Sequence, residues 1–154
     1  MKLNGLFDVL RGWPREGAID ETFPAHKSGG VLDVLPPGTV VTMQVADGSM
    51  AVATTPDRTA VDALPTWVVV EGTDDFSGQF VEKVVCLRSN AMFRLDPANF
   101  NAGTYALRTP LTFSAGKWQE AATKDQIIGE VMSDDRATNG TIVVFYHGGT
   151  AAKL

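Results

Sequence analysis

The side chains of this chain that could support catalysis or bind a metal are few and widely separated. The two histidines are His26 and His147, and the sequence places neither near the single cysteine or near a convincing serine or aspartate partner. A metal site needs three or four donors at close spacing, and a catalytic triad would have to use one of these histidines. The sequence therefore predicts no catalytic residue, no metal site and no cofactor, and we expect that the protein is not an enzyme.

Two pairs of adjacent aspartates, Asp74-Asp75 and Asp134-Asp135, are the remaining candidates for acid–base chemistry. Neighbouring residues on an extended strand point to opposite faces, so neither pair is a good carboxylate dyad. The pairs stand at corresponding places in the two halves of the chain, and aspartate favours turn geometry. We interpret them as turn residues.

The bulk composition is that of one globular domain. The 154 residues are 44% hydrophobic and 20% charged, which is enough to bury a core without disulfides. The net charge of −5, without a cluster of Lys and Arg, predicts no nucleic-acid partner. No apolar run is long enough to cross a bilayer and no signal peptide is recognisable, so we expect no membrane partner. Cys86 lies in the apolar run 84–87 and is predicted to be a buried side chain, in a protein that folds in a reducing cytoplasm.

The elements that would position these residues begin with an N-terminal arm, predicted over residues 1–30. Four of its apolar residues have the i, i+3, i+4, i+7 spacing of a short amphipathic helix: Leu3, Leu6, Phe7 and Leu10. Gly12 and Pro14 then end this helix. So short a helix is not stable alone, and its apolar face could pack either on the chain's own body or on a neighbouring subunit.

Residues 31–147 are predicted to form an all-β body, and residues 148–154 a frayed C-terminal tail. Runs rich in β-branched and aromatic residues, bounded by turn signals, predict the strands: 39–45, 50–54, 66–71, 80–87, 91–95, 103–107, 110–113, 117–121, 126–132 and 141–147. Asp47-Gly48 and Ala115-Gly116 are the turns of two hairpins.

The two halves of this body repeat one another. Asp47-Gly48 corresponds to Ala115-Gly116 and Gly38-Thr39 to Gly103-Thr104, while residues 67–71 correspond to residues 127–131. Each half is a hairpin plus a strand pair that cannot bury its apolar face alone. We therefore expect two similar units that face each other in a small β-barrel or β-tulip-like sandwich.

Apolar residues that such a body does not need to cover are candidates for a capsid or subunit interface. They lie in the arm and in the segment that joins the halves, with one on the second hairpin: Leu3, Leu6, Phe7, Leu10, Trp13, Phe93, Phe100 and Trp118. For Trp118 the sequence leaves two alternatives open, an interface anchor or a cap on the barrel. Trp67 is predicted to be a core residue.

Residues 37–42 (PGTVVT) and 46–54 (ADGSMAVAT), followed by an apolar strand and an Asp-rich turn, form a pattern that residues 128–131 and 140–145 repeat. Over about residues 31–147 this pattern resembles the head decoration (capsid cement) proteins of tailed bacteriophages. The resemblance implies a small β protein on the outer capsid surface of the virion, made in the host cytoplasm. It also implies that the protein binds the major capsid protein, stabilises contacts between its subunits, and forms a homotrimer or homodimer, with no catalytic residues.

The residues leave two other functions open. One is a virion-associated module that binds carbohydrate or a host receptor, in which exposed Trp118 and Tyr105 would line a groove for sugar stacking. The other, with the least support, is a small hydrolase that uses His147 with an acid.

Overall fold

The computed structural model describes residues 2–3, 7–11, 20–73 and 82–153, and for those before Thr22 only the backbone. The strands are β1 (Lys2–Leu3), β2 (Phe7–Arg11), β3 (Asp20–Pro24), β4 (Lys27–Ser28), β5 (Val31–Leu32), β6 (Val40–Met43), β7 (Met50–Val52), β8 (Leu64–Glu71), β9 (Lys83–Leu87), β10 (Ala91–Leu95), β11 (Pro110–Ser114), β12 (Lys117–Glu120), β13 (Gly129–Asp135), β14 (Thr141–Tyr146) and β15 (Thr150–Ala151). The helical elements are the 3-10 turns η1 (Pro97–Asn99) and η2 (Lys124–Gln126) and the short α1 (Arg136–Asn139).

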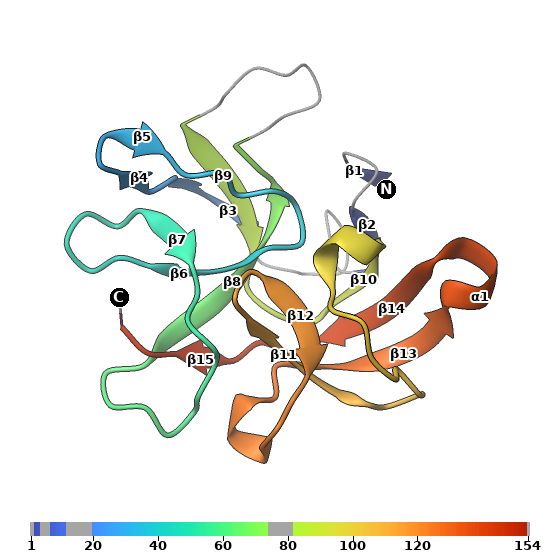
Figure 1. The fold of residues 1–154 in the computed structure, drawn as a ribbon. Coiled ribbons are helices and arrows are strands. Elements are labelled where there is room, and N and C mark those ends of the chain that lie inside the picture. The colour runs from blue at the N-terminus through green and yellow to red at the C-terminus, as the bar shows by residue number, and fades with distance from the viewer. Residues whose placement is uncertain (1, 4–6, 12–19, 74–81, 154) are drawn as a thin grey trace.

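The strands form two main sheets that pack on each other as a sandwich (Figure 1). One sheet has the order β1-β2-β10-β14-β13-β11-β12, and the other has the order β3-β9-β8-β6-β7, with β15 paired to β8. The predicted all-β class is confirmed. Of the two arrangements expected, a barrel or a sandwich, the structure shows the sandwich and not the barrel, because the two sheets have separate strand orders and do not join into one closed sheet.

The predicted N-terminal helix is wrong. Residues 2–3 and 7–11 form strands, and α1 is the only α-helix in the described part of the chain. β2 pairs antiparallel with β10, where Val9 lies opposite Phe93. An isolated two-turn helix is marginal, whereas the edge of β10 offers backbone hydrogen bonds that an extended segment can satisfy. This pairing is with the chain's own body, one of the two alternatives that the sequence left open.

Two further expectations about elements are wrong. Residues 103–107, predicted as a strand, form a turn-rich connection to β11. The segment after His147 is not frayed throughout, because Thr150 and Ala151 pair with Pro65 and Leu64 of β8. Ala151 is fully buried, so this contact closes the core next to β8.

The predicted internal repeat is confirmed by the strand order. The sequence β9-β8-β6-β7 in one sheet matches β14-β13-β11-β12 in the other, and β3 and β10 occupy the same place beside β9 and β14. We call β3 and β6–β9, with their connections, the first unit, and β10–β14 the second unit. The first unit thus begins at β3, within the segment that the sequence set apart as an arm.

Register and irregularities also match between the units. Val41 lies opposite Trp67 as Leu111 lies opposite Gly129. Each unit has a register shift at the same place, between Val69 and Glu71 in the first and between Val131 and Ser133 in the second. Isolated parallel bridges correspond too, Ala25 with Met50 and Phe100 with Trp118. These matches make the two units copies of one backbone design.

The sequence alignment of the two halves was correct at the hairpins and wrong beside them. Asp47-Gly48 and Ala115-Gly116 do occupy the same turn, between β6 and β7 and between β11 and β12. Gly38, however, corresponds to Arg108, since each donates its backbone N–H to the matching residue, Val69 O or Val131 O. Both residues have positive φ, 92° and 69°. Gly103 is therefore not the counterpart of Gly38, although both are glycines. The connections in the two units differ in length, so residues of the same type do not fall at the same place.

The core shows how the units are stacked. The front face of the first unit carries one apolar cluster, to which the segment 23–35 contributes its cover. The buried members of this cluster are Ala25, Leu35, Val41, Met50, Trp67, Val69, Val84 and Cys86. The back face of the first unit carries other residues: Val40, Ala53, Val68, Val70 and Leu87. These lie in one cluster with the front face of the second unit: Phe100, Tyr105, Leu111, Phe113, Trp118, Val131, Ile142, Val144 and Tyr146. The units therefore do not face each other, as was expected, but stack front to back.

Candidate functional site

Three of the predicted interface residues are core residues. Phe93, Phe100 and Trp118 are 0%, 7% and 0% exposed, so the prediction that they form an interface is wrong. Each points inward because its strand or bridge alternates between the two faces of the sheet, and all three lie in the cluster between the units. Leu3, Phe7 and Leu10 lie on β1 and β2, where only the backbone is described, and Leu6 and Trp13 lie outside the described residues.

Trp118 and Tyr105 do not line an exposed groove. They are 0% and 1% exposed, so the sugar-stacking site that was built on them is wrong. The indole Nε1 of Trp118 donates a hydrogen bond of 2.8 Å to the carbonyl oxygen of Gly38. The hydroxyl of Tyr105 donates to the carbonyl oxygen of Asn101. Both aromatic side chains therefore stabilise the body.

The sequence missed one cluster of catalytic residue types, which joins the segment before β4 to the β6–β7 turn. The Oγ of Ser49 donates to Oδ1 of Asp47 over 2.6 Å and lies 3.5 Å from Nδ1 of His26. The hydrogen bond from the Ser49 side chain is the main cause that lowers the pKa of Asp47. Because the serine proton is directed at the carboxylate and not at the imidazole, the cluster lacks the nucleophile–base geometry of a triad. The cluster is a turn whose serine lies beside His26. The Ala25–Met50 bridge brings the histidine segment and the turn together.

The aspartate pair of the second unit lies at the end of a strand and not in the turn, where it was predicted. Asp134 and Asp135 are the last two residues of β13, paired with Ile142 and Thr141 of β14, and α1 forms the turn that follows. The carboxylate of Asp134 accepts two hydrogen bonds from the guanidinium of Arg136, at 2.8 and 2.7 Å, and one from its backbone N–H at 3.2 Å, and this arginine lowers the pKa of Asp134 to about 2. Arg136 also lies over the ring of Tyr105, 5.0 Å from its centroid. Asp74-Asp75 lies outside the described residues.

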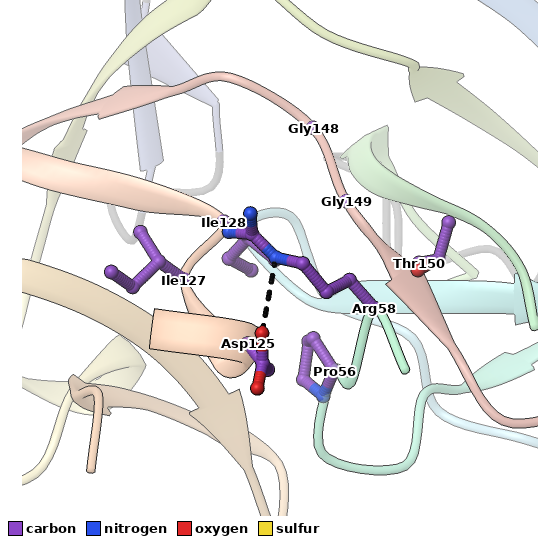
Figure 2. A pocket seen from close by; sticks show the side chains of 8 residues that line it. All are labelled: Pro56, Arg58, Asp125, Ile127, Ile128, Gly148, Gly149 and Thr150. Atoms are coloured by element: carbon purple, nitrogen blue, oxygen red, sulfur yellow. Dashed lines mark ion pairs between the residues drawn. The ribbon is translucent and has the colours of Figure 1, made fainter. Parts of the chain in front are cut away.

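A pocket of about 250 Å³ lies at the junction of the two units. Figure 2 shows Arg58 of the first unit and Asp125 of η2 pointing toward each other across it, with Gly148 and Gly149 on the connection between β14 and β15. The Nε of Arg58 is 3.8 Å from Oδ1 of Asp125, and its Nη2 donates to the Lys124 carbonyl over 2.8 Å. The two charges of the pocket are thus turned toward partners within the chain, and the pocket brings together no nucleophile and base.

The described residues contain no group of three or more His, Cys, Asp or Glu side chains placed to hold a metal ion. Cys86 is buried, as predicted, and desolvation raises the pKa of its thiol. His147 is exposed, and its ring lies 5.6 Å from the ring of Phe145. Within the described part of the chain, no helix is long and apolar enough to span a bilayer.

Exposed aliphatic side chains gather in the first unit. Val31, Val34 and Val45 are 71%, 63% and 56% exposed, and they lie on the β4–β5 hairpin, after it, and on the β6–β7 turn. In the second unit Leu107 is 68% exposed and Met132 of β13 is 37% exposed. Single exposed apolar residues are ordinary, but the three valines flank the half-buried Leu32 and Met43.

No family model, no curated protein and no solved structure matches this chain. The fold itself defines the class as a duplicated β-sandwich, in which two copies of a β unit stack front to back. Its candidate functional site is a surface with exposed aliphatic residues, together with the segment that precedes the first unit.

Proposed function

We propose that this chain is a decoration, or cement, protein that binds the outer surface of a bacteriophage head and stabilises contacts between major capsid protein subunits. The resemblance that motivates the proposal rests on residues 37–54 and 128–145. In the fold these stretches are the β6–β7 hairpin of the first unit and the β13–β14 pair of the second, which are different parts of the repeat. The pattern behind the resemblance is therefore spread over both units.

The observation that carries the proposal is the position of the first nineteen residues. They precede β3, where the first unit begins, and they have no counterpart in the second unit. Of this segment the structure describes the backbone of β1 and β2, and the described residues of both front clusters follow it in the chain. A segment outside the repeated unit can supply binding surface to a partner, and many equivalent copies on a shell turn modest contacts into firm attachment.

Deletion of residues 1–14 tests this role. We expect the shortened chain to keep its two units folded, because the described residues of both clusters lie within residues 23–151, and to bind heads at least tenfold more weakly. The measurement is co-sedimentation with undecorated expanded heads assembled from the major capsid protein of the same genome. The full-length chain is the control, and thermal unfolding checks the fold. Unchanged binding by the shortened chain would contradict the role of the segment, and the absence of binding by the full-length chain would contradict the proposed function.

A further inference from the structure

The pocket at the junction of the two units is built from connections that correspond to each other. Its lining comes from the β7–β8 connection of the first unit, from the β12–β13 connection of the second, and from the chain between β14 and β15 with the first residue of β15. The β7–β8 and β12–β13 connections occupy the same place in the repeat. Stacking of the units brings them together, so neither unit alone contains this pocket (Figure 2).

Backbone hydrogen bonds hold the walls of the pocket in place. Arg58 donates its backbone N–H to the carbonyl oxygen of Asp125 over 2.9 Å, which joins the two corresponding connections. Asp57 donates its backbone N–H to the carbonyl oxygen of Thr150, also over 2.9 Å, which joins the first connection to β15. The carboxylate of Asp57 accepts from the backbone N–H of Thr59 over 2.9 Å and fixes the turn beside the pocket. The pocket is therefore preformed, as small-molecule sites usually are.

The two charged side chains of the pocket use only part of their bonding capacity. A guanidinium has five N–H donors, and among the described residues that of Arg58 makes one hydrogen bond, to the carbonyl oxygen of Lys124. The 3.8 Å between its Nε and Oδ1 of Asp125 is too long for a hydrogen bond. In the described part of the chain, the carboxylate of Asp125 accepts no hydrogen bond. These side chains are 58% and 33% exposed, so a ligand can reach both.

The pairing of opposite charges restricts the chemistry of a ligand. A simple anion is attracted by Arg58 but repelled by the carboxylate of Asp125, and a simple cation meets the reverse. A ligand that carries a carboxylate and an ammonium close together satisfies both residues through charge-assisted hydrogen bonds. In an α-amino acid these two groups are attached to the same carbon atom, so they can reach two protein charges that lie side by side.

The rest of the lining and the size of the pocket favour a small aliphatic ligand. Pro56, Ile127 and Ile128 supply the apolar part of the wall, and Thr150 adds one hydroxyl. The volume of about 250 Å³ is below the roughly 300–1,000 Å³ of pockets that hold drug-sized ligands. A single amino acid with an aliphatic side chain suits this space and this wall.

We propose that the pocket binds a free α-amino acid with an aliphatic side chain, of which leucine is representative. The carboxylate of the ligand pairs with the guanidinium of Arg58, its ammonium pairs with the carboxylate of Asp125, and its side chain lies against the apolar wall. This site goes beyond the proposed attachment to heads, and neither depends on the other. Because the pocket joins the two units, the bound ligand also stabilises the folded chain.

Titration of the full chain with L-leucine, followed in amide NMR spectra, tests the site. We expect saturable shifts of the Gly148 and Gly149 amide signals, while the signals of Gly48 and Gly140, which do not line the pocket, stay unchanged. N-acetylleucine lacks the ammonium and leucinamide lacks the carboxylate, so each should bind roughly tenfold more weakly or worse. Glucose represents a neutral polar ligand and should cause no shift.

Two variants test the charges on the protein side. Arg58→Gln and Asp125→Asn each remove one charge with little change in size, and each should weaken leucine binding roughly tenfold or more. Arg108→Gln is the matched control, since it removes the arginine of another exposed ion pair, with Glu130 at 3.1 Å, and should leave binding unchanged. Thermal unfolding gives a second readout, because leucine should raise the Tm of the wild type and of the control more than that of either pocket variant. The series of leucine analogues on the wild type decides the question if a pocket variant does not fold.

Saturable shifts that require both charges of the ligand support the inference. The absence of saturable shifts up to the solubility limit of leucine overturns it. Binding of N-acetylleucine or leucinamide as tight as that of leucine overturns it too, as does an equal response to glucose. Leucine binding by a chain that does not bind heads refutes only the proposed function, whereas head binding without leucine binding refutes only this inference.

Discussion

At the scale of single residues, the close packing of the connection before β6 depends on one glycine. A Cβ atom on Gly72 would lie 2.1 Å from the carbonyl oxygen of Leu35. This contact cannot relax easily, because Leu35 donates its N–H to the hydroxyl of Thr73 over 2.9 Å, and that hydroxyl donates to the carbonyl of Asp33 over 2.9 Å. Leu35 in turn closes the front cluster of the first unit.

We therefore expect Gly72→Ala to lower the free energy of unfolding by about 1–3 kcal/mol, because the backbone must shift in a packed core. Urea unfolding followed by circular dichroism measures the change. Gly103→Ala is the control, since the nearest atom to a Cβ there lies at 3.6 Å, an ordinary contact, and its effect should stay within about 0.5 kcal/mol. Equal stability of the two variants would show that segment 33–35 moves freely.

At the scale of elements, polar contacts fix how the two units are stacked. Trp118 on β12 donates to the carbonyl of Gly38, and Tyr146 on β14 bonds both the carbonyl and the hydroxyl of Thr66 on β8, at 2.9 and 2.8 Å. Burial raises the pKa of the Tyr146 hydroxyl, so it stays protonated and able to donate. Apolar contact alone has no direction, and these bonds set the angle and register between the sheets.

Tyr146→Phe tests this contribution. The ring keeps its place in the core, but two buried oxygen atoms of Thr66 lose a partner, so we expect a loss of about 1–3 kcal/mol in the free energy of unfolding. A double-mutant cycle with Thr66→Val separates the pair energy from the individual effects. Additive effects of the two substitutions would mean that the hydroxyl does not couple the units.

At the scale of the whole molecule, the stacked units share one core. Val40, Val68, Val70 and Leu87 of the first unit are 0% exposed and lie in the same cluster as the front of the second. Either unit alone would expose this apolar surface to water. The units should therefore be mutually dependent for stability, although each one repeats the same strand order.

We expect the full chain to unfold in one cooperative transition, and a fragment of residues 20–90 to be largely unfolded. Trp67 and Trp118 report on the first and second unit, so single-tryptophan variants followed by fluorescence should give coincident urea curves. The fragment is examined by circular dichroism and by binding of a hydrophobic dye. Two separated transitions, or a stably folded fragment, would show that the units are independent domains.

The strands, the hairpins and the duplication could be predicted from local patterns. Asp47-Gly48 and Ala115-Gly116 are turn signals whose geometry depends on the residues themselves. The N-terminal helix failed because the spacing of Leu3, Phe7 and Leu10 fits one helix face, whereas pairing with β10 decides the backbone. The predicted interface failed at Phe93, Phe100 and Trp118 because an aromatic residue looks the same in sequence whether a second sheet covers it or not.

The sequence by itself determined that this chain is a β protein with two similar halves, since turns and strand alternation are local properties. Only the tertiary structure decided that the halves stack front to back, that the first begins at β3, and that His26 meets Ser49. The reason is physical: each unit has two apolar faces, and which face meets which depends on the packing of residues far apart in the chain.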